Sequence, residues 1–219
     1  MGLTYAEENY LKAILRLSVP RDTIVSTNAV AAHLETSAAS VTDMLKKLAE
    51  KEFITYQRYK GAQLTEQGYK ISTALVRKHR LWEVFLVQSL GMSWDEVHDI
   101  AEELEHIQSD HLIDKLDAFL GHPKFDPHGD PIPNAQGKYT LRAQLLLTEL
   151  KPGQEGIIIG VREADNSLLR HLNDKGITIG KKAILHDNDP YDQTIRLTIE
   201  DKELSISGKV AQNILIKLI

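Results

Sequence analysis

The chain has 219 residues and no cysteine, with 42% hydrophobic and 26% charged residues and a formal net charge of −5. This composition is that of a soluble globular protein long enough for one large or two small domains. The lack of cysteine excludes a disulfide framework and thiol redox sensing. No apolar run reaches membrane-spanning length, and the start lacks the order of a signal peptide, so we expect a cytoplasmic protein.

The charge is unevenly distributed along the chain. Residues 36–80 carry nine Lys or Arg against four Asp or Glu, whereas residues 81–120 carry one basic residue against ten acidic ones. A basic segment followed by an acidic one is the pattern expected of a nucleic-acid surface joined to a cation site.

The N-terminal third predicts three helices. Leu3–Ser18 is amphipathic, and a short helix follows that Ser26 or Thr27 can cap. After a three-residue turn, a longer helix begins at its cap Ser37 and runs to about Lys51. This arrangement is typical of a helix-turn-helix, although an ordinary helical hairpin has the same pattern.

The segment after these helices favours DNA binding. Two β-rich runs flank Arg58-Tyr59-Lys60-Gly61, which predicts a hairpin with a basic, aromatic tip. A helix-turn-helix followed by such a hairpin is a winged helix. In this arrangement, small residues at the start of the recognition helix approach the bases, while basic residues reach phosphates. The predicted DNA-contacting residues are Thr27, Ser37, Ala39, Ser40, Thr42, Lys46, Lys47, Arg58 and Lys60.

A predicted helix over Val97–Asp110 concentrates acidic and imidazole side chains on one face. At 100° per residue, an arc of about 80° holds four of them. These are His98, Glu102, Glu105 and His106. Stacked carboxylates repel one another unless a cation offsets their charge, so the stripe indicates a metal site. An acidic surface helix is the alternative interpretation.

The preceding helix, predicted over Glu66–Leu90 with Thr65 as its cap, adds His79 and Glu83 four residues apart. Because the connection between the two helices is short, we expect antiparallel packing with the two stripes facing each other. Such a set offers only nitrogen and oxygen ligands, which suit six-coordinate Mn(II) or Fe(II).

The rest of the chain predicts a linker and a β domain. Residues 121–138 contain four prolines and three glycines, which indicates an extended strap, and we interpret His122 and His128 within it as structural. From Leu141 to Ile219, short strands surround a helical insert at Asp165–Asn173, which predicts a small SH3-like β-barrel with a binding or regulatory role. Three polar residues near this insert are left unassigned: Glu163, Asp165 and Asn166.

With these residues assembled, the chain resembles the metal-dependent repressors of the diphtheria toxin repressor family over essentially its whole length. The resemblance is most specific in RKHRLWE…VHDIAEELEHIQSD, where five residues match the family's ligand positions: His79, Glu83, His98, Glu105 and His106. It implies a mainly helical start and a β end. The implied domains are a winged-helix DNA-binding domain at 1–75, a metal-binding and dimerisation domain at 76–140 that includes the strap 121–138, and an SH3-like domain at 141–219.

The ligand set departs from both branches of the family. Glu102 stands where the iron-responsive branch has a cysteine, as in the manganese-responsive branch. Asn9 stands at the ligand position of the first helix, and Lys12 replaces a glutamate there, which disfavours a second ion. The ancillary site of the iron branch is kept as His79, Glu83 and His98. The resemblance therefore implies Mn(II) as the first choice of metal and Fe(II) as the second.

The sequence thus predicts a metal-activated, homodimeric repressor that is not an enzyme, governs manganese or iron uptake, and binds a palindromic DNA operator. Apolar candidates for the dimer surface are Trp82, Phe85, Leu112, Leu116 and Phe119, and packing in the core is an equally good interpretation of each. One alternative is a carboxylate-bridged di-iron enzyme, but the chain has only one Glu-x-x-His motif, at residues 103–106. Another is a metal-buffering protein, which would not require a winged helix.

We also expect the metal-free state to differ from the metal-bound state. Without an ion, Glu83, Glu102 and Glu105 are expected to repel one another. The first helix would then have nothing that tethers it to the metal-binding segment.

Overall fold

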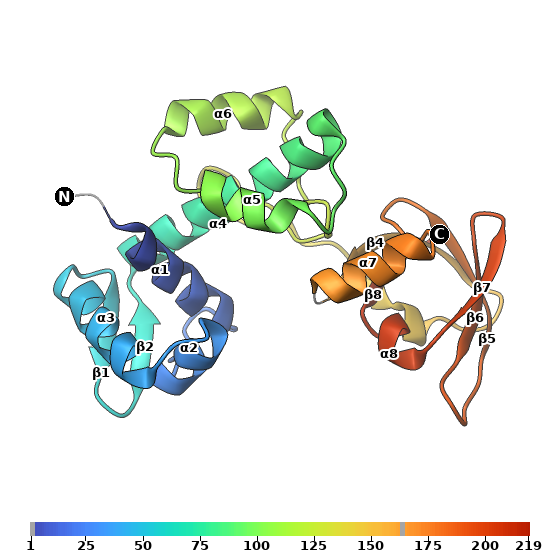
Figure 1. Ribbon diagram of the computed structural model, residues 1–219, viewed down its shortest axis with the longest axis horizontal. Coiled ribbons are helices and arrows are strands. Elements are labelled where there is room, and N and C mark those ends of the chain that lie inside the picture. The colour runs from blue at the N-terminus through green and yellow to red at the C-terminus, as the bar shows by residue number, and fades with distance from the viewer. Residues whose placement is uncertain (1–2, 163–164) are drawn as a thin grey trace. The chain divides into compact units, whose positions relative to one another are not determined.

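The computed structural model describes residues 3–162 and 165–219, and Figure 1 shows their helices and strands. Two compact units are distinguished by their internal contacts. The first comprises the chain up to His79, Glu102–Asp110 and Pro133–Tyr139, and the second comprises Arg80–Ala101, His111–Ile132 and Thr140–Ile219. Within the described residues, no helix has both the length and the apolar character needed to span a membrane.

The first unit begins as a winged helix, which confirms the prediction. Its elements, blue to cyan in Figure 1, are α1 (Tyr5–Leu17), α2 (Thr27–His33), α3 (Ala38–Glu50), β1 (Ile54–Gln57) and β2 (Gly61–Leu64). Thr4 caps α1 in a capping box with Glu7, while Ser26 and Ser37 cap α2 and α3 through their side-chain oxygens. Each helix therefore starts where a small polar residue can accept a hydrogen bond from the first turn.

Apolar residues at helical spacing build the core of this unit. Leu11 and Ile14 of α1 pack with Val41, Leu45 and Leu48 of α3, and all five are fully buried. The apolar side of α1 therefore packs against α3, the predicted recognition helix. The polar side of α1 remains available for other contacts.

The hairpin is anchored at its base. Val25 and Ala62 exchange two backbone hydrogen bonds of 2.8 Å each. Gly61 has φ of 127°, and a Cβ there would lie 2.2 Å from the Val25 carbonyl oxygen, so only glycine fits. The tip at residues 58–60 projects into solvent from this fixed base.

Helix α4 (Glu66–Leu90) spans the predicted residues, and its first turn is capped by Thr65, which accepts from the Gly68 amide at 3.1 Å. The single helix predicted over 97–110 is wrong. Instead, α5 (Val97–Leu104) ends before Glu105, and α6 (Asp110–Phe119) starts after a turn.

The turn after α5 has a partner that is distant in the sequence. The Lys78 ammonium of α4 donates to the carbonyl of Ile107 at 3.1 Å, so this backbone group is paired without a helical hydrogen bond. Glu105 and His106 lie in the turn rather than on a helix, so the helical arc predicted for the four metal-ligand candidates does not exist.

The second unit contains the predicted β domain as one antiparallel sheet with the strand order β3-β8-β4-β5-β6-β7. Its elements are β3 (Leu145–Leu146), a 3-10 turn (Leu147–Glu149), β4 (Glu155–Val161), α7 (Asn166–Asp174), β5 (Lys182–Asn188), β6 (Ile195–Ile199), β7 (Lys202–Ile206), α8 (Gly208–Ala211) and β8 (Ile214–Leu218). The first strand and α8 are too short for a periodic sequence signal. Asp165 caps α7, whereas Glu163 lies outside the described residues.

The strap is an irregular segment fastened to the sheet. Residues 121–138, all of them described, form no helix and no strand of the sheet. The Arg142 guanidinium donates to the carbonyls of Gly129 and Ile159 at 2.7 and 2.5 Å, and the Val161 amide donates to the His128 carbonyl at 2.9 Å. A Cβ on Gly129 would lie 2.3 Å from the Ile159 oxygen, so this glycine permits the close approach.

Gly68 provides a test of the packing at the start of α4. A Cβ at this position would lie 1.9 Å from the Phe53 carbonyl oxygen. Because that oxygen belongs to the backbone, the clash cannot be relieved by rotating a side chain. We expect Gly68→Ala to lower the free energy of unfolding by about 1–3 kcal/mol, despite alanine's better helix propensity. Denaturant unfolding measures this, with Gln67→Ala on the same turn as the control. Equal stability of the two variants would show that the backbone yields without cost.

Candidate metal centre and nucleic-acid interface

Three potential ligands meet within the first unit. His79 Nδ1 lies 2.8 Å from Glu105 Oε2 and 3.7 Å from Glu102 Oε1. Each of the three residues offers a ligand atom, and these atoms lie within 4.8 Å of one another. Glu105 is fully buried. Two carboxylates and one imidazole form a set suited to a divalent cation that prefers oxygen and nitrogen.

A lysine of α1 occupies the same cluster. Lys12 Nζ lies 2.6 Å from Glu102 Oε1, and 2.6 and 2.8 Å from the two carboxylate oxygens of Glu105. The expected repulsion between Glu102 and Glu105 is therefore wrong, because an ammonium already lies between them. The expectation of an untethered first helix is wrong for the same reason.

A second set of contacts joins α1 to the turn that follows α5. Glu8 Oε2 lies 2.5 Å from His106 Nδ1, and Glu8 Oε1 accepts from Gln108 at 2.8 Å. The Tyr5 ring stacks on His106 with 4.3 Å between centroids. The sequence analysis missed Glu8, although its position beside Asn9 on the first helix was an available signal.

Asn9 fits the role of an additional ligand. Its Oδ1 atom is buried and has no hydrogen-bond partner among the residues that the structure describes. It lies three residues before Lys12 on α1, and thus on the same side of that helix. A buried acceptor without a donor is costly, and a bound cation would satisfy it.

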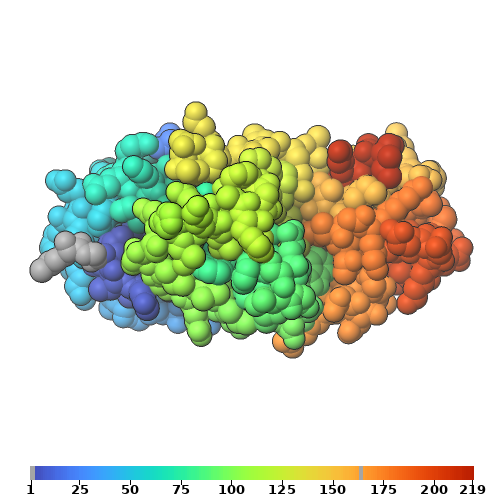
Figure 2. Space-filling model, turned by 90° about the horizontal axis from the view of Figure 1, so that it is seen from above, coloured from blue at the N-terminus to red at the C-terminus, as the bar shows by residue number. Residues whose placement is uncertain are grey.

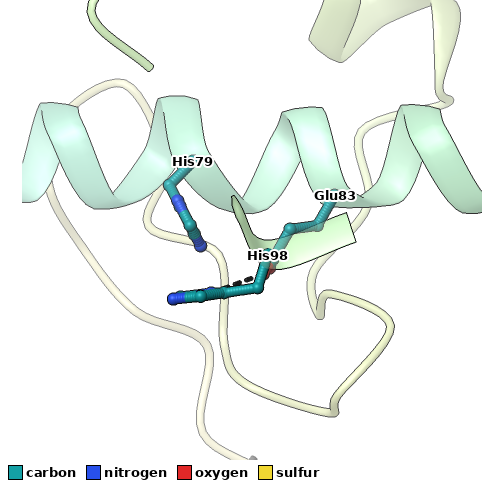
Figure 3. Close-up of side chains that lie close together, drawn as sticks. All are labelled: His79, Glu83 and His98. Atoms are coloured by element: carbon teal, nitrogen blue, oxygen red, sulfur yellow. Dashed lines mark ion pairs between the residues drawn. The ribbon is translucent and has the colours of Figure 1, made fainter. Parts of the chain in front are cut away.

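The remaining predicted ligands lie along α4 and at the start of α5. Figure 3 shows His79 and Glu83 projecting from one side of α4, with His98 beside Glu83. His98 Nδ1 lies 3.5 Å from Glu83 Oε1. His79, Glu83 and His98 each offer a ligand atom, and these atoms lie within 4.8 Å of one another.

Glu83 also belongs to a buried cluster that the sequence analysis missed. Glu83, Asp126 and His128 are all buried and offer ligand atoms within 4.8 Å. Arg80 Nε lies 3.3 Å from Asp126, and His128 lies between Glu83 at 3.5 Å and the Trp94 carbonyl at 2.7 Å. The alternation of acidic and imidazole residues in the strap was the available sequence signal.

Burial and charge shift the pKa values in this cluster. Desolvation, with the charges of Glu83 and Asp130, raises the pKa of Asp126 to about 7 against the opposing charges of Arg80 and His128. Burial alone would lower the pKa of His128. The hydrogen bond and charge of Glu83, the charge of Asp126 and the Trp94 carbonyl outweigh it and raise this pKa to about 9. A protonated imidazole thus stabilises the acidic pair.

Four of the nine predicted DNA-contacting residues meet at one groove of the winged helix. Thr27, Thr42, Arg58 and Lys60 line a groove of about 450 Å³ between the starts of α2 and α3 and the hairpin. The other predicted residues are exposed: Ser37, Ala39, Ser40, Lys46 and Lys47. Arg58 also lies 4.9 Å from the ring centre of Tyr59, a residue that is 91% exposed.

The candidate dimer surface is partly exposed. Phe119 is 70% exposed and lies 6.2 Å from the Phe85 ring, which itself packs on Trp82 at 5.8 Å. Leu112 is half-exposed, whereas Trp82 and Leu116 are buried. Side chains of α6, yellow-green in Figure 2, lie at the surface of the molecule. Of the five candidates, Trp82 and Leu116 therefore lie in the core of this chain and not at its surface.

A winged helix in one unit with a cluster of nitrogen and oxygen ligands defines a metal-responsive DNA-binding regulator. Comparison with known protein families leads to the same class of protein. Residues 2–62 match the iron dependent repressor N-terminal DNA binding domain, residues 65–134 match the iron dependent repressor metal binding and dimerisation domain, and residues 145–218 match the FeoA domain.

Individual relatives give the same result. The iron-dependent repressor IdeR of Mycobacterium leprae is 30% identical over 183 residues, which cover 78% of this chain and 79% of that protein. The diphtheria toxin repressor of Corynebacterium jeikeium is 33% identical over 104 residues, 48% of this chain but only 43% of that relative. A solved structure of a manganese-dependent transcriptional repressor complex with manganese has a TM-score of 0.81 and 33% identity, over 97% of this chain and 100% of that chain.

The chain belongs to the iron-dependent repressor family, whose members are metal-responsive transcriptional repressors. This result confirms the resemblance, the fold class and the general function predicted from the sequence. The family is one of repressors rather than of enzymes, and it supports a divalent metal ion, DNA and a second copy of the chain as partners.

The His128 cluster predicts a pH dependence of the metal-free protein. Because the folded pKa of His128, about 9, exceeds the reference value of 6.5, its stabilising contribution is complete below pH 6.5 and is lost as the pH rises through 9. We expect the free energy of unfolding, measured by denaturant in chelator, to fall across this window. His128→Gln should flatten the decline, and the exposed control His111→Gln should not. An unchanged decline in His128→Gln would contradict the assignment.

Proposed function

We propose that this protein is a homodimeric, metal-activated repressor of the cytoplasm that binds a palindromic operator and controls manganese uptake, with iron as the second candidate. The observation that carries the proposal is that one compact unit contains both the winged helix and the cluster of His79, Glu102 and Glu105. Side chains of α1 join the two, so a change at the cluster acts directly on the DNA-binding part.

In this proposal two groups of residues hold metal. Asn9, Glu102, Glu105 and His106 form the primary set, and His79, Glu83 and His98 form the ancillary set. The bound ion supplies positive charge to paired carboxylates, and the residues on α1 orient the winged helix through their contacts with the turn after α5. The proposed domain limits are 1–75, 76–140 and 141–219, whereas the matched family ranges are 2–62, 65–134 and 145–218.

The choice of Mn(II) rests on the chemistry of Glu102. A carboxylate at this position is a harder ligand than the thiolate of the iron branch, so it favours Mn(II) in relative terms, although raw affinity follows the Irving–Williams order. The solved manganese-dependent repressor supports this choice, whereas the similarity to iron-dependent repressors keeps Fe(II) as the second candidate.

DNA docking is proposed to use the recognition helix α3 and the hairpin. Ser37, Ala39, Ser40 and Thr42 lie at or near the start of α3, where short side chains allow close approach to base edges. The basic residues that reach phosphates are Lys46, Lys47, Arg58 and Lys60. Thr27, the first residue of α2, completes the proposed DNA-contacting set. Two copies of the chain would present two recognition helices to the two half-sites of a palindrome.

Removing a phosphate contact tests this docking mode. We expect Lys47→Ala and Arg58→Ala each to weaken binding of cognate and random duplexes alike and to reduce the salt slope of log K by about 1. Fluorescence anisotropy across a salt series measures this. Lys202→Ala, an exposed lysine on β7, is the matched control. Wild-type slopes in both test variants would rule out these contacts.

Reciprocal titrations test the switch itself. If metal favours the DNA-competent form, DNA must tighten metal binding by the same factor, with an ordinary coupling of about 1–3 kcal/mol. We expect Glu105→Gln to abolish metal-stimulated DNA binding while the protein remains a folded dimer. Glu103→Gln, an exposed neighbour, should behave as wild type.

The same titrations separate the function from the metal. Equal DNA affinity in chelator and in saturating Mn(II) and Fe(II) would refute metal activation. Activation of the wild type by Fe(II) under anaerobic conditions, without activation by excess Mn(II), would overturn the manganese assignment and leave the repressor function intact.

A further inference from the structure

Lys12 contributes an ammonium to a site whose other members are all potential metal ligands. Its Nζ lies 2.6 to 2.8 Å from three carboxylate oxygens of Glu102 and Glu105. A lysine ammonium has three donors, and these three oxygens match them in number. Its side chain is only 19% exposed and Glu105 is fully buried, so solvent screens this contact weakly.

The contact is a requirement of the metal-free state. A buried carboxylate without a compensating cation is strongly unfavourable, and Glu105 has no exposed surface through which water could solvate it. Lys12 therefore supplies in the resting protein the charge that a metal ion would supply in the active one.

A divalent cation bound by the same carboxylates would meet this ammonium. It has to share oxygens with a neighbouring positive charge or displace Lys12 from them, and both routes weaken binding. A nearby lysine has a different partner: Lys51, the C-cap residue of α3, pairs with Glu7 of α1 at 2.6 Å.

We propose that Lys12 is a resident cation of the primary site, which holds the metal-free cluster together and lowers its affinity for a divalent ion by competing for Glu102 and Glu105. The inference rests on the proposed function, because it takes these carboxylates as metal ligands. It adds that one residue sets the concentration of metal at which this repressor responds.

The test removes the charge and keeps the length of the side chain. In Lys12→Met we expect Mn(II) to bind about tenfold more tightly or better in calorimetric titrations of the full-length protein at pH 7. In chelator the same variant should have a lower melting temperature, and Mn(II) should raise it by more than in the wild type. Lys12→Gln should repeat both effects if Lys12→Met folds poorly, whereas Lys12→Arg should retain the weak affinity.

Two controls connect the effect to this cluster. Lys51→Met, at the end of α3, removes an ion pair to Glu7 with the same 2.6 Å distance and should leave Mn(II) affinity unchanged. In a Glu105→Gln background, Lys12→Met should have a smaller effect, because only Glu102 remains as a carboxylate that Lys12 and the metal share.

The outcomes distinguish this inference from the proposed function. Mn(II) binding by the wild type with unchanged or weaker affinity in folded Lys12→Met or Lys12→Gln would overturn the role of Lys12 alone. Absence of Mn(II) binding in the wild type and in both variants would overturn the proposed metal site, and the role of Lys12 with it.

Discussion

The pairing of the fully buried Glu105 carboxylate with a cation is the interaction on which the arrangement around it depends. Its position in a turn, rather than on a helix, allows it to meet Lys12 from α1 and His79 from α4 at once. Three segments far apart in the chain converge on one negative charge. Because an unpaired buried charge is so unfavourable, whatever cation is present there controls how these segments hold together.

Helix α4 contributes one residue to each of two ligand clusters. His79 and Glu83 lie one turn apart on it, and they take part in different clusters, His79 with Glu102 and Glu105 and Glu83 with the buried Asp126 and His128. The helical rise fixes the spacing of the two residues regardless of loop conformation. Both residues belong to one continuous helix of 25 residues.

Those irregular segments are themselves held by backbone contacts. The strap residues next to His128 and Asp126 are fixed where Gly129 lies against β4 and Arg142 bridges the two backbones. The second unit therefore joins its sheet to its helical part through the same residues that surround Glu83. A glycine at 129 has a structural reason here, since any side chain would collide with the Ile159 carbonyl.

Local pattern alone determined much of this protein. Periodicity, caps and turn residues predicted α1 to α4, the hairpin, the strap and the longer strands of the sheet, because these signals act over a few neighbouring residues. They also identified His79, Glu83, His98, Glu102, Glu105 and His106 as candidates. Tertiary structure alone decided how these group, since Lys12 and Glu8 meet residues 102–108 across some 90 positions or more. It also ended α5 at Leu104, because long-range partners such as Lys78 for Ile107 outweigh the local helical pattern.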